Sequence, residues 1–306
     1  MNISSIMRSF AVAALLCCGH SLLAQEMQQK TFATPEDAVV ALVDAAKADN
    51  TNELRALFGI EGEKVLVSGD PVMDQRSREV FLVAYAEHAG LMTASATRRI
   101  LYIGSEDWPF PVPLVKENQT WRFDTAAGAQ EIQFRRIGRN ELTTIRVCQV
   151  YVEAQQEYAA SAHDEKSVGV YAQKIASTPG KHDGLYWKSE DSEHLSPLGE
   201  FAAEAAAEGY RPSEGQPTPF HGYFFRILTG EGKSAERGAR SYIVNGEMRA
   251  GFALIAHPAV YGRSGVMSFI VNQNGLVYQK DLGPQTATIA AKISRFNPDS
   301  GWKKVE

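Results

Sequence analysis

The sequence NELTTIRVCQVYVEAQQEYA, residues 140–159, predicts a long amphipathic helix near the middle of the 306-residue chain. At 100° per residue, its apolar side chains cover an arc of roughly 180°, interrupted chiefly by Gln155, and its polar side chains cover roughly 100° of the opposite side. Since a helix on one flat surface needs a narrower apolar stripe, we expect this helix to lie in a groove. Asn140 is a good N-cap residue, and Glu141 suits the positive end of the helix dipole.

Five strand-like segments later in the chain offer this helix an internal partner. Short turns between them favour an antiparallel sheet, and Asn and Gly in NQNG (272–275) and at 245–246 predict tight turns. The segments are GYFFRILTG (222–230), RSYIVNG (240–246), GFALIAHP (251–258), GVMSFIV (265–271) and LVYQKDL (276–282). We expect a helix-on-sheet domain over residues 139–283, with an irregular insertion at 161–219 and a C-terminal tail at 284–306.

Residues 31–128 have helical signals first and strand signals later, which is typical of an α+β unit. Thr34 and Pro35 predict the start of a helix, and Gly59 predicts the end of a second, short helix. A third helix is expected from Pro71 to Ala89. Short β-rich runs follow at 97–104, 111–118 and 120–125. The sequence therefore predicts an α+β, cone-like domain over residues 31–128, and an α+β class for the whole protein.

The first 24 residues have the pattern of a cleaved signal peptide. Arg8 precedes an apolar run of about ten residues, about half of the roughly 20 needed to span a bilayer, and Ala24 fits a cleavage site. We expect a periplasmic or secreted protein with no stable membrane span after cleavage. Of the three cysteines, only Cys148 would then remain, so no internal disulfide is possible and a small buried hydrophobe is expected. The net charge of −5 is dispersed, and nucleic acid is not an expected partner.

Three resemblances accompany these patterns. The order of long helix, irregular segment and antiparallel sheet, with the words GYFFRI, GFALIAHP and GVMSFIVNQNGLVY, resembles type IV pilin and pseudopilin heads over about 139–283. True pilins begin with a long apolar anchoring helix, whereas a polar domain precedes the helix here, so this resemblance does not imply fibre assembly. ATPEDAVVALVDAAKADNTNELRALFG and TWRFDT resemble nuclear-transport-factor-2-like domains over about 31–125.

The third resemblance covers nearly all of the mature chain. WPFPVPLVKENQTWRFDTAAGAQEI, RRIGRNEL, TPGKHDGLYW and MRAGFALIAHPAVYGRSGVM resemble an exported bacterial family known as domain of unknown function 2950. That family brings no known activity with it, so functional residues must be sought in the sequence itself.

No complete motif for catalysis, a cofactor or a metal emerges. TGEGKS (229–234) lacks the earlier glycine of a phosphate-binding loop. Ser264 lies in GRSG, which is not the GxSxG pattern of a nucleophile elbow, and His257 could act as its base only if the fold brought the two together. The insertion holds polar ligand types without zinc or calcium spacing, which favours a solvated loop. These residues are His163, Asp164, Glu165, His182, Asp183, Asp191, Glu193 and His194. We therefore predict no catalytic residue, no cofactor and no bound metal.

Aromatic residues beside Gly or Pro in expected loops suggest a binding surface. Such side chains stack on sugars or anchor a protein partner, although they also pin loops onto a core. The candidate residues are His182, Asp183, Tyr186, Trp187, Tyr223 and Trp108.

The favoured hypothesis is a non-catalytic binding or scaffolding protein of the cell envelope, whose partner is an unidentified envelope protein or polysaccharide. The alternative is a hydrolase that uses a cavity in the N-terminal domain, near Tyr85, Glu87 and His88. A minor fibre subunit is the third possibility.

Overall fold

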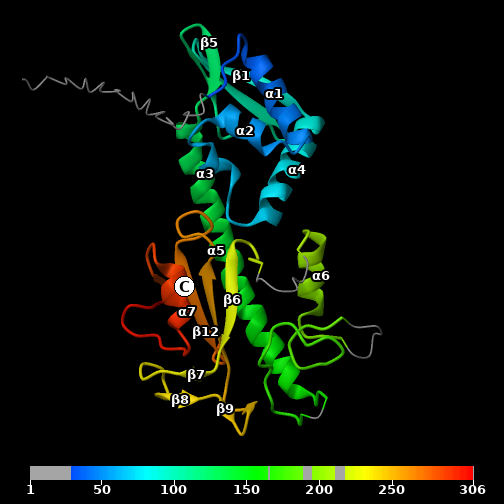
Figure 1. Ribbon diagram of the computed structural model, residues 1–306, viewed down its shortest axis with the longest axis vertical. Helices are drawn as coiled ribbons and strands as arrows, with labels where there is room; N and C mark the ends of the chain where they lie inside the picture. Colours follow the sequence, from blue (N-terminus) through cyan, green and yellow to red (C-terminus); the bar gives the residue numbers. More distant parts are fainter. Residues whose placement is uncertain (1–28, 165, 189–194, 211–217, 306) are drawn as a thin grey trace, which may run out of the picture.

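The computed structural model describes residues 29–164, 166–188, 195–210 and 218–305. Two units lie at the two ends of one long helix, α5 (Thr125–Ala160), with the N-terminal unit at the top of Figure 1. The expected signal peptide and its cleavage site lie outside the described residues. Within those residues, none of the helices combines the length and the apolar character needed to cross a membrane.

The N-terminal unit packs four helices against one antiparallel sheet. The strand order is β1-β2-β4-β5, with β3 paired to β2. The helices are α1 (Pro35–Lys47), α2 (Thr51–Phe58), α3 (Gly62–Leu66) and α4 (Pro71–Glu87). The strands are β1 (Ala89–Ser95), β2 (Arg98–Ile103), β3 (Trp108–Pro109), β4 (Leu114–Glu117) and β5 (Thr120–Phe123).

Local signals explain where these elements begin and end. The Thr34 hydroxyl accepts a hydrogen bond from the Asp37 amide at 3.1 Å, and this N-cap confirms the predicted start of α1. Gly59 ends α2 at a φ of +67°, which glycine adopts without strain, as the sequence predicted. Strand β1 was not predicted, because its residues are mostly exposed and show no apolar alternation.

The prediction that Asn140 begins the long helix is wrong. Helix α5 starts at Thr125, where the Asp124 carboxylate accepts a hydrogen bond from the Ala127 amide at 3.4 Å. Asn140 lies inside the helix and is buried, and its Nδ2 donates to the Ser264 carbonyl at 2.9 Å. Asparagine favours helix starts, but it is tolerated inside this helix because a carbonyl of a distant loop accepts a hydrogen bond from its side-chain amide.

The C-terminal unit is built on a five-stranded antiparallel sheet in the order β14-β13-β12-β11-β6. The main strands are β6 (Tyr223–Leu228), β11 (Ala253–Pro258), β12 (Met267–Asn272), β13 (Tyr278–Asp281) and β14 (Lys303–Lys304). Helix α5 packs on β11 and β12, and the Tyr151 hydroxyl donates to the Ala253 carbonyl at 3.1 Å. The expected helix-on-sheet arrangement is therefore present.

Two expected parts of this unit differ from the prediction. The segment 240–246 is not in the main sheet: β8 (Arg240–Ser241) pairs with β7 (Gly230–Glu231), and β9 (Ile243–Val244) pairs with β10 (Glu247–Met248). The expected tail at 284–306 contributes helix α7 (Thr286–Lys292) and strand β14, and its Phe296 is buried in the core. The sheet edge therefore extends beyond residue 283.

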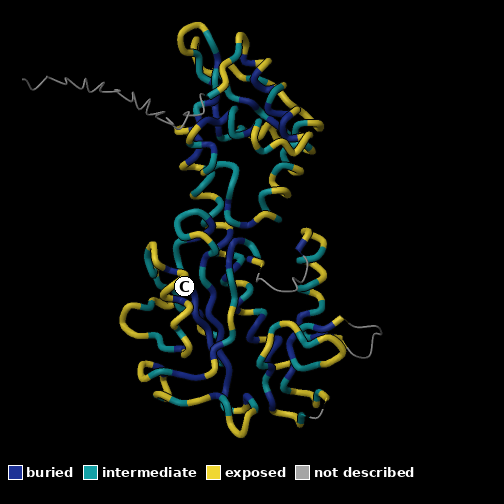
Figure 2. The backbone as a smooth tube through the Cα atoms, viewed as in Figure 1, coloured by how far each residue is buried: buried dark blue, intermediate teal, exposed yellow. Residues whose placement is uncertain are grey.

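The wide apolar arc of α5 is filled from two sides. One side meets the sheet, and the other carries the irregular insertion, which includes α6 (Gly199–Ala207) (Figures 1 and 2). Gln155, the polar residue that interrupts the arc, is fully buried. Its side-chain amide donates to the Ala172 carbonyl at 2.8 Å, and its carbonyl accepts from the Ala172 amide at 2.9 Å. The helix therefore lies in a groove, as its width predicted.

Asp70 connects the two units. Its Oδ1 caps α4 by accepting from the Val72 and Met73 amides at 3.1 and 3.2 Å. Its Oδ2 accepts from the Tyr210 hydroxyl at 2.7 Å and from the Gly222 amide at 2.8 Å. Because the carboxylate is fully buried, one side chain both starts α4 and joins it to the C-terminal unit.

Candidate functional site

The N-terminal unit contains a cavity of about 670 Å³ that is partly open to solvent. This volume falls within the roughly 300–1,000 Å³ of small-molecule pockets. Every helix of the unit and the first part of α5 contribute to its wall. The apolar lining includes Leu42, Ala46, Leu54, Phe58, Leu66, Phe81, Ala84, Ile103, Phe110 and Ile132. The cavity therefore offers mainly apolar surface to a ligand.

Five arginines line the same cavity, and four of them are engaged within the protein. Arg78 pairs with Asp49 at 2.8 Å, and Arg76 pairs with Glu79 at 3.5 Å. Arg135 pairs with Glu131 at 2.6 Å and lies over the Trp108 ring, 5.3 Å from its centroid. Arg136 donates to the main-chain carbonyls of Lys64, Val65 and Val67.

The side chain of the fifth arginine, Arg139, has no hydrogen bond or ion pair with any described residue. Burial lowers the pKa of the Arg136 guanidinium, and the positive charges of Arg139 and Arg263 lower it further, while Asp74 opposes them. Arg263 comes from the loop between β11 and β12 and is not part of the cavity lining, but its charge acts on Arg136, as that of Arg139 does. This end of the cavity carries an excess of positive charge.

Asp74, the carboxylate at this end, is itself occupied. It accepts hydrogen bonds from the Ser68 amide at 3.0 and 3.1 Å. Burial raises its pKa, although the Ser68 bonds and the Arg136 charge work in the opposite direction. Asp74 therefore neutralises the cluster only in part. The other lining carboxylates, Glu87 and Glu106, belong to the C-terminal end of α4 and to the turn after β2.

This site was missed in the sequence because its parts are far apart along the chain. The segment RRIGR places Arg135, Arg136 and Arg139 within five residues, and a helix presents residues three or four apart on one face. That spacing was the available signal, but it has functional meaning only beside the apolar wall that α1, α2 and α4 supply.

The residues expected to serve a hydrolase in this cavity do not converge. Glu87 lines the cavity, whereas Tyr85 and His88 are not part of its lining. Tyr85 packs near Phe81, with ring centroids 6.1 Å apart, and His88 Nε2 lies 3.2 Å from the exposed Asp107 carboxylate. The described wall thus places Glu87 beside apolar groups and without either expected partner.

The expected binding residues of the insertion form a compact cluster on α5. The His163 ring stacks on Tyr158 at a centroid distance of 4.1 Å, and Trp187 lies 4.6 Å from His182 and 5.5 Å from His163. Trp187 is only 9% exposed, and Tyr186 is half-buried. These contacts favour the interpretation that the aromatics pin the loop onto the helix.

Asp183 organises the same loop. Its carboxylate accepts hydrogen bonds from Lys174 Nζ at 2.7 Å and from the Thr178 amide and hydroxyl at 2.7 and 2.9 Å. Burial acts to raise the pKa of Asp183, but these bonds outweigh it and hold the pKa well below its usual range. The carboxylate is therefore used inside the loop.

Two members of the expected surface lie elsewhere. Tyr223 is fully buried in β6, where its hydroxyl donates to the Met267 carbonyl at 2.9 Å, so placing it on a binding surface is wrong. Its strand alternates between faces, and this side chain points into the core. Trp108 is 52% exposed in the N-terminal unit and lines the cavity described above. The six residues therefore do not form one surface.

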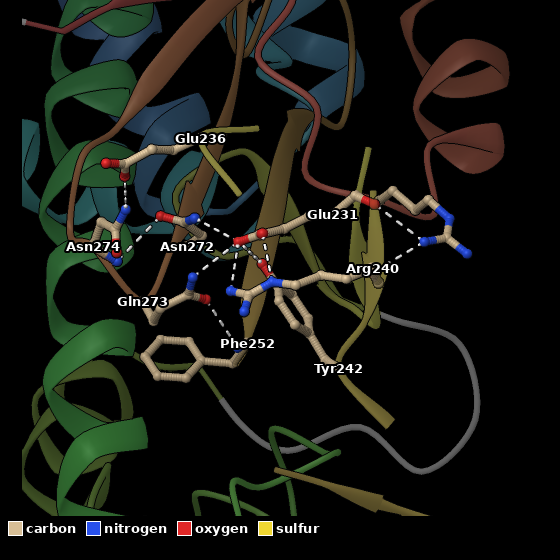
Figure 3. Close-up of polar contacts among 9 residues, drawn as sticks. Glu231, Glu236, Arg240, Tyr242, Phe252, Asn272, Gln273 and Asn274 are labelled. Carbon is tan, nitrogen blue, oxygen red and sulfur yellow. Dashed lines mark hydrogen bonds and ion pairs between the residues drawn. The ribbon is translucent and has the colours of Figure 1, made fainter. Parts of the chain in front are cut away.

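The segment TGEGKS surrounds a buried carboxylate instead of a phosphate. Glu231 is 2% exposed, pairs with Arg240 at 2.7 Å, and accepts from the Tyr242 hydroxyl at 2.8 Å (Figure 3). Asn272 and Gln273 donate to it at 3.1 and 2.9 Å. Burial acts to raise the pKa of Glu231, but these donors lower it to about 2.

The amides of this segment are also satisfied internally. Gly232 donates to the Phe296 carbonyl at 2.9 Å, and Ser234 donates to the Asn297 side chain at 2.8 Å. A phosphate loop needs such amides free to point at the ligand. The internal bonds agree with the hairpin loop inferred from the sequence.

Other reactive groups are buried or dispersed. Burial raises the pKa of the Cys148 thiol to about 12. Ser264 is fully buried and its hydroxyl bonds with Val260. In the described ranges, no group of three or more His, Cys, Asp and Glu residues is placed to hold a metal ion. Glu165, Asp191, Glu193 and His194 of the insertion lie outside those ranges.

The chain matches no curated protein and no solved structure. The resemblances to pilin heads and to nuclear-transport-factor-2-like domains are therefore not confirmed by a homologue or a structural neighbour. Residues 29–305 match the model of a family described as protein of unknown function (DUF2950). Because that match covers both units and the insertion, the chain belongs to this family.

Proposed function

We propose that this protein is a non-catalytic binding protein of the cell envelope, and that the cavity of the N-terminal unit is its ligand site. The observation that carries the proposal is the cavity of about 670 Å³ with a mainly apolar wall. Burial of apolar ligand surface contributes about 25 cal/mol per Å², so such a wall favours a ligand with a substantial apolar part.

The location is proposed from the leader pattern of the sequence. Residues 1–24 have the charge, apolar run and small residues of a cleaved export signal. Mass spectrometry of the protein from its native host should find Gln25 at the N-terminus. Retention of Met1–Ala24 on the purified protein would contradict export by this route.

A neutral apolar dye tests the cavity directly. We expect Nile red fluorescence to rise when the dye is mixed with the protein, because the dye leaves water for an apolar environment. Ser77 lies on α4, is exposed and lines the cavity, so Ser77→Trp should fill part of the space and weaken dye binding at least about fivefold. Gln75 is exposed on the same helix outside the lining, so Gln75→Trp is the matched control.

The two variants separate pocket binding from adventitious binding. Circular dichroism should show the same melting temperature for both, since each changes an exposed residue. If Ser77→Trp and Gln75→Trp bind the dye as well as the wild type, the cavity is not the binding site and the proposal fails.

A further inference from the structure

The cavity is polarised along its length. Its basic end lies between the first half of α4 and the first half of α5, where Arg136 and Arg139 are found. Of its three acidic residues, Glu87 lies at the C-terminal end of α4 and Glu106 in the turn after β2, whereas Asp74 lies at the basic end. The rest of the wall is mainly apolar, and its other arginines, Arg76, Arg78 and Arg135, are paired with carboxylates. A ligand that matches this wall needs an apolar body and one charged end.

Within the described ranges, two guanidinium groups near the basic end, those of Arg139 and Arg263, have no polar partner. Arg139 lines the cavity and Arg263 does not, and neither side chain has a hydrogen bond or ion pair with any residue that the structure describes. By contrast, Arg136 beside them is committed to three main-chain carbonyls. Arg139 and Arg263 therefore have donors available for a ligand.

The loop that carries Arg263 is held against α5. Gln133 Nε2 donates to the Gly262 carbonyl, and Asn140 Nδ2 donates to the Ser264 carbonyl at 2.9 Å. These bonds lie on both sides of Arg263 in the loop and on both sides of Arg136 and Arg139 in the helix. The loop position is thus defined by contacts that do not use the arginines themselves.

Positive charges placed near one another in this way repel each other. Guanidinium groups stay charged at any physiological pH, and the single carboxylate among them, Asp74, is already bonded to Ser68. An anion placed between Arg139 and Arg263 would relieve the repulsion and accept charge-assisted hydrogen bonds, which are about twice as strong as neutral ones. The repulsion therefore favours an anionic ligand over a neutral or cationic one.

We propose that the cavity binds an anionic amphiphile, with its alkyl chain against the apolar wall and its carboxylate or phosphate head group held by Arg139 and Arg263. The inference rests on the proposed function, since it names the ligand class of the same cavity. A free fatty acid and a lipid phosphate share this head-group chemistry.

Calorimetric titration with decanoate, decanol and decyltrimethylammonium tests the ligand class. Each compound is used below the concentration at which it forms micelles, and the protein is expressed with its own leader. The three compounds share one chain length and differ in charge. We expect decanoate to bind at least about tenfold more tightly than decanol, and decyltrimethylammonium to bind most weakly. Decyl phosphate, tested in parallel, distinguishes a phosphate from a carboxylate preference.

The double variant Arg139→Gln with Arg263→Gln should weaken decanoate binding about tenfold or more and change decanol binding less than about twofold. Arg146→Gln is the matched control, because Arg146 is on the same helix, exposed, and paired with Glu204 at 3.4 Å away from the cavity lining. It should leave all four affinities unchanged. A far-ultraviolet spectrum and melting curve for each variant show whether the fold is retained.

The outcomes separate this inference from the proposed function. If the three head groups bind with equal affinity, or the double variant binds decanoate unchanged, the ligand class is wrong. The proposed function still stands in that case, provided that Ser77→Trp weakens dye binding. Failure of every decyl compound to bind, together with dye binding that Ser77→Trp does not affect, overturns both.

Discussion

The charge on Glu231 should stabilise the fold by an amount that depends on pH in a defined direction. Its carboxylate is 2% exposed and accepts hydrogen bonds from Arg240, Tyr242, Asn272 and Gln273. The folded-state pKa is about 2, compared with an ordinary value of 4.5. Because the folded pKa is the lower one, the stabilisation is complete above about pH 4.5 and is lost as the pH falls through 2.

The magnitude follows from the two pKa values. The folded and ordinary pKa values differ by about 2.5, and each pKa unit corresponds to about 1.36 kcal/mol. The charge therefore contributes about 3 kcal/mol to the free energy of unfolding at neutral pH, and roughly 2 kcal/mol of this should be lost by pH 3. Because Arg240, the charged partner of Glu231, is 26% exposed, solvent screening makes these figures upper limits. Glu231→Gln cannot titrate in this range and therefore lacks this component of the pH dependence.

Urea unfolding of the wild type and Glu231→Gln at pH 7 and pH 3 measures the effect. We expect the stability difference between the two proteins to shrink by about 2 kcal/mol at the lower pH. Asp183 also has a lowered pKa and titrates in the same direction, so Asp183→Asn in both backgrounds is the control. A change of less than about 0.5 kcal/mol in the difference would refute the reasoning.

Three further predictions concern buried groups. Asp70→Ala should lower the free energy of unfolding by about 2–4 kcal/mol, because it removes the α4 cap and the bond to Tyr210; an unchanged urea midpoint would contradict this. Asn140→Ala should lower it by about 1–3 kcal/mol, whereas Leu142→Ala, at a side chain 70% exposed on the same helix, should change it by less than about 0.5 kcal/mol. Cys148 should not react with a disulfide reagent in the native protein and should react after denaturation, because burial raises its pKa to about 12; rapid native reaction would argue against this burial.

Much of the local structure could be predicted from the sequence because short-range signals control it. Thr34, Gly59 and the Asn-Gly turn at 245–246 act within one turn of chain, and the structure confirms all three. The start of α5 could not be predicted in this way. Residues 125–139 carry no continuous apolar stripe, since that part of the helix bridges the two units, whereas Asn140 carries a strong capping signal that a tertiary contact overrides.

The candidate binding residues also show what local sequence signals can predict and what they cannot. Aromatic residues beside glycine or proline were the visible signal, but Tyr223 is a core residue and Trp187 packs against His163 and His182. In a sequence, an exposed aromatic and a loop-anchoring aromatic look alike. Trp108 was the exception, since it lines the cavity, yet nothing in its neighbourhood along the chain indicated a pocket.

The sequence by itself determined the α+β class, the position of most helices and strands, and the resemblance to the family that covers residues 29–305. Each of these follows from periodicity, caps and turns, which act over a few residues. Only the tertiary structure decided where the cavity lies that we propose as the ligand site. The apolar wall comes from helices spread over the first half of the chain, and Arg263 joins Arg136 and Arg139 across more than a hundred residues. No local sequence pattern predicts that these arginines lie near one another, because the packing of the two units along α5 places them there.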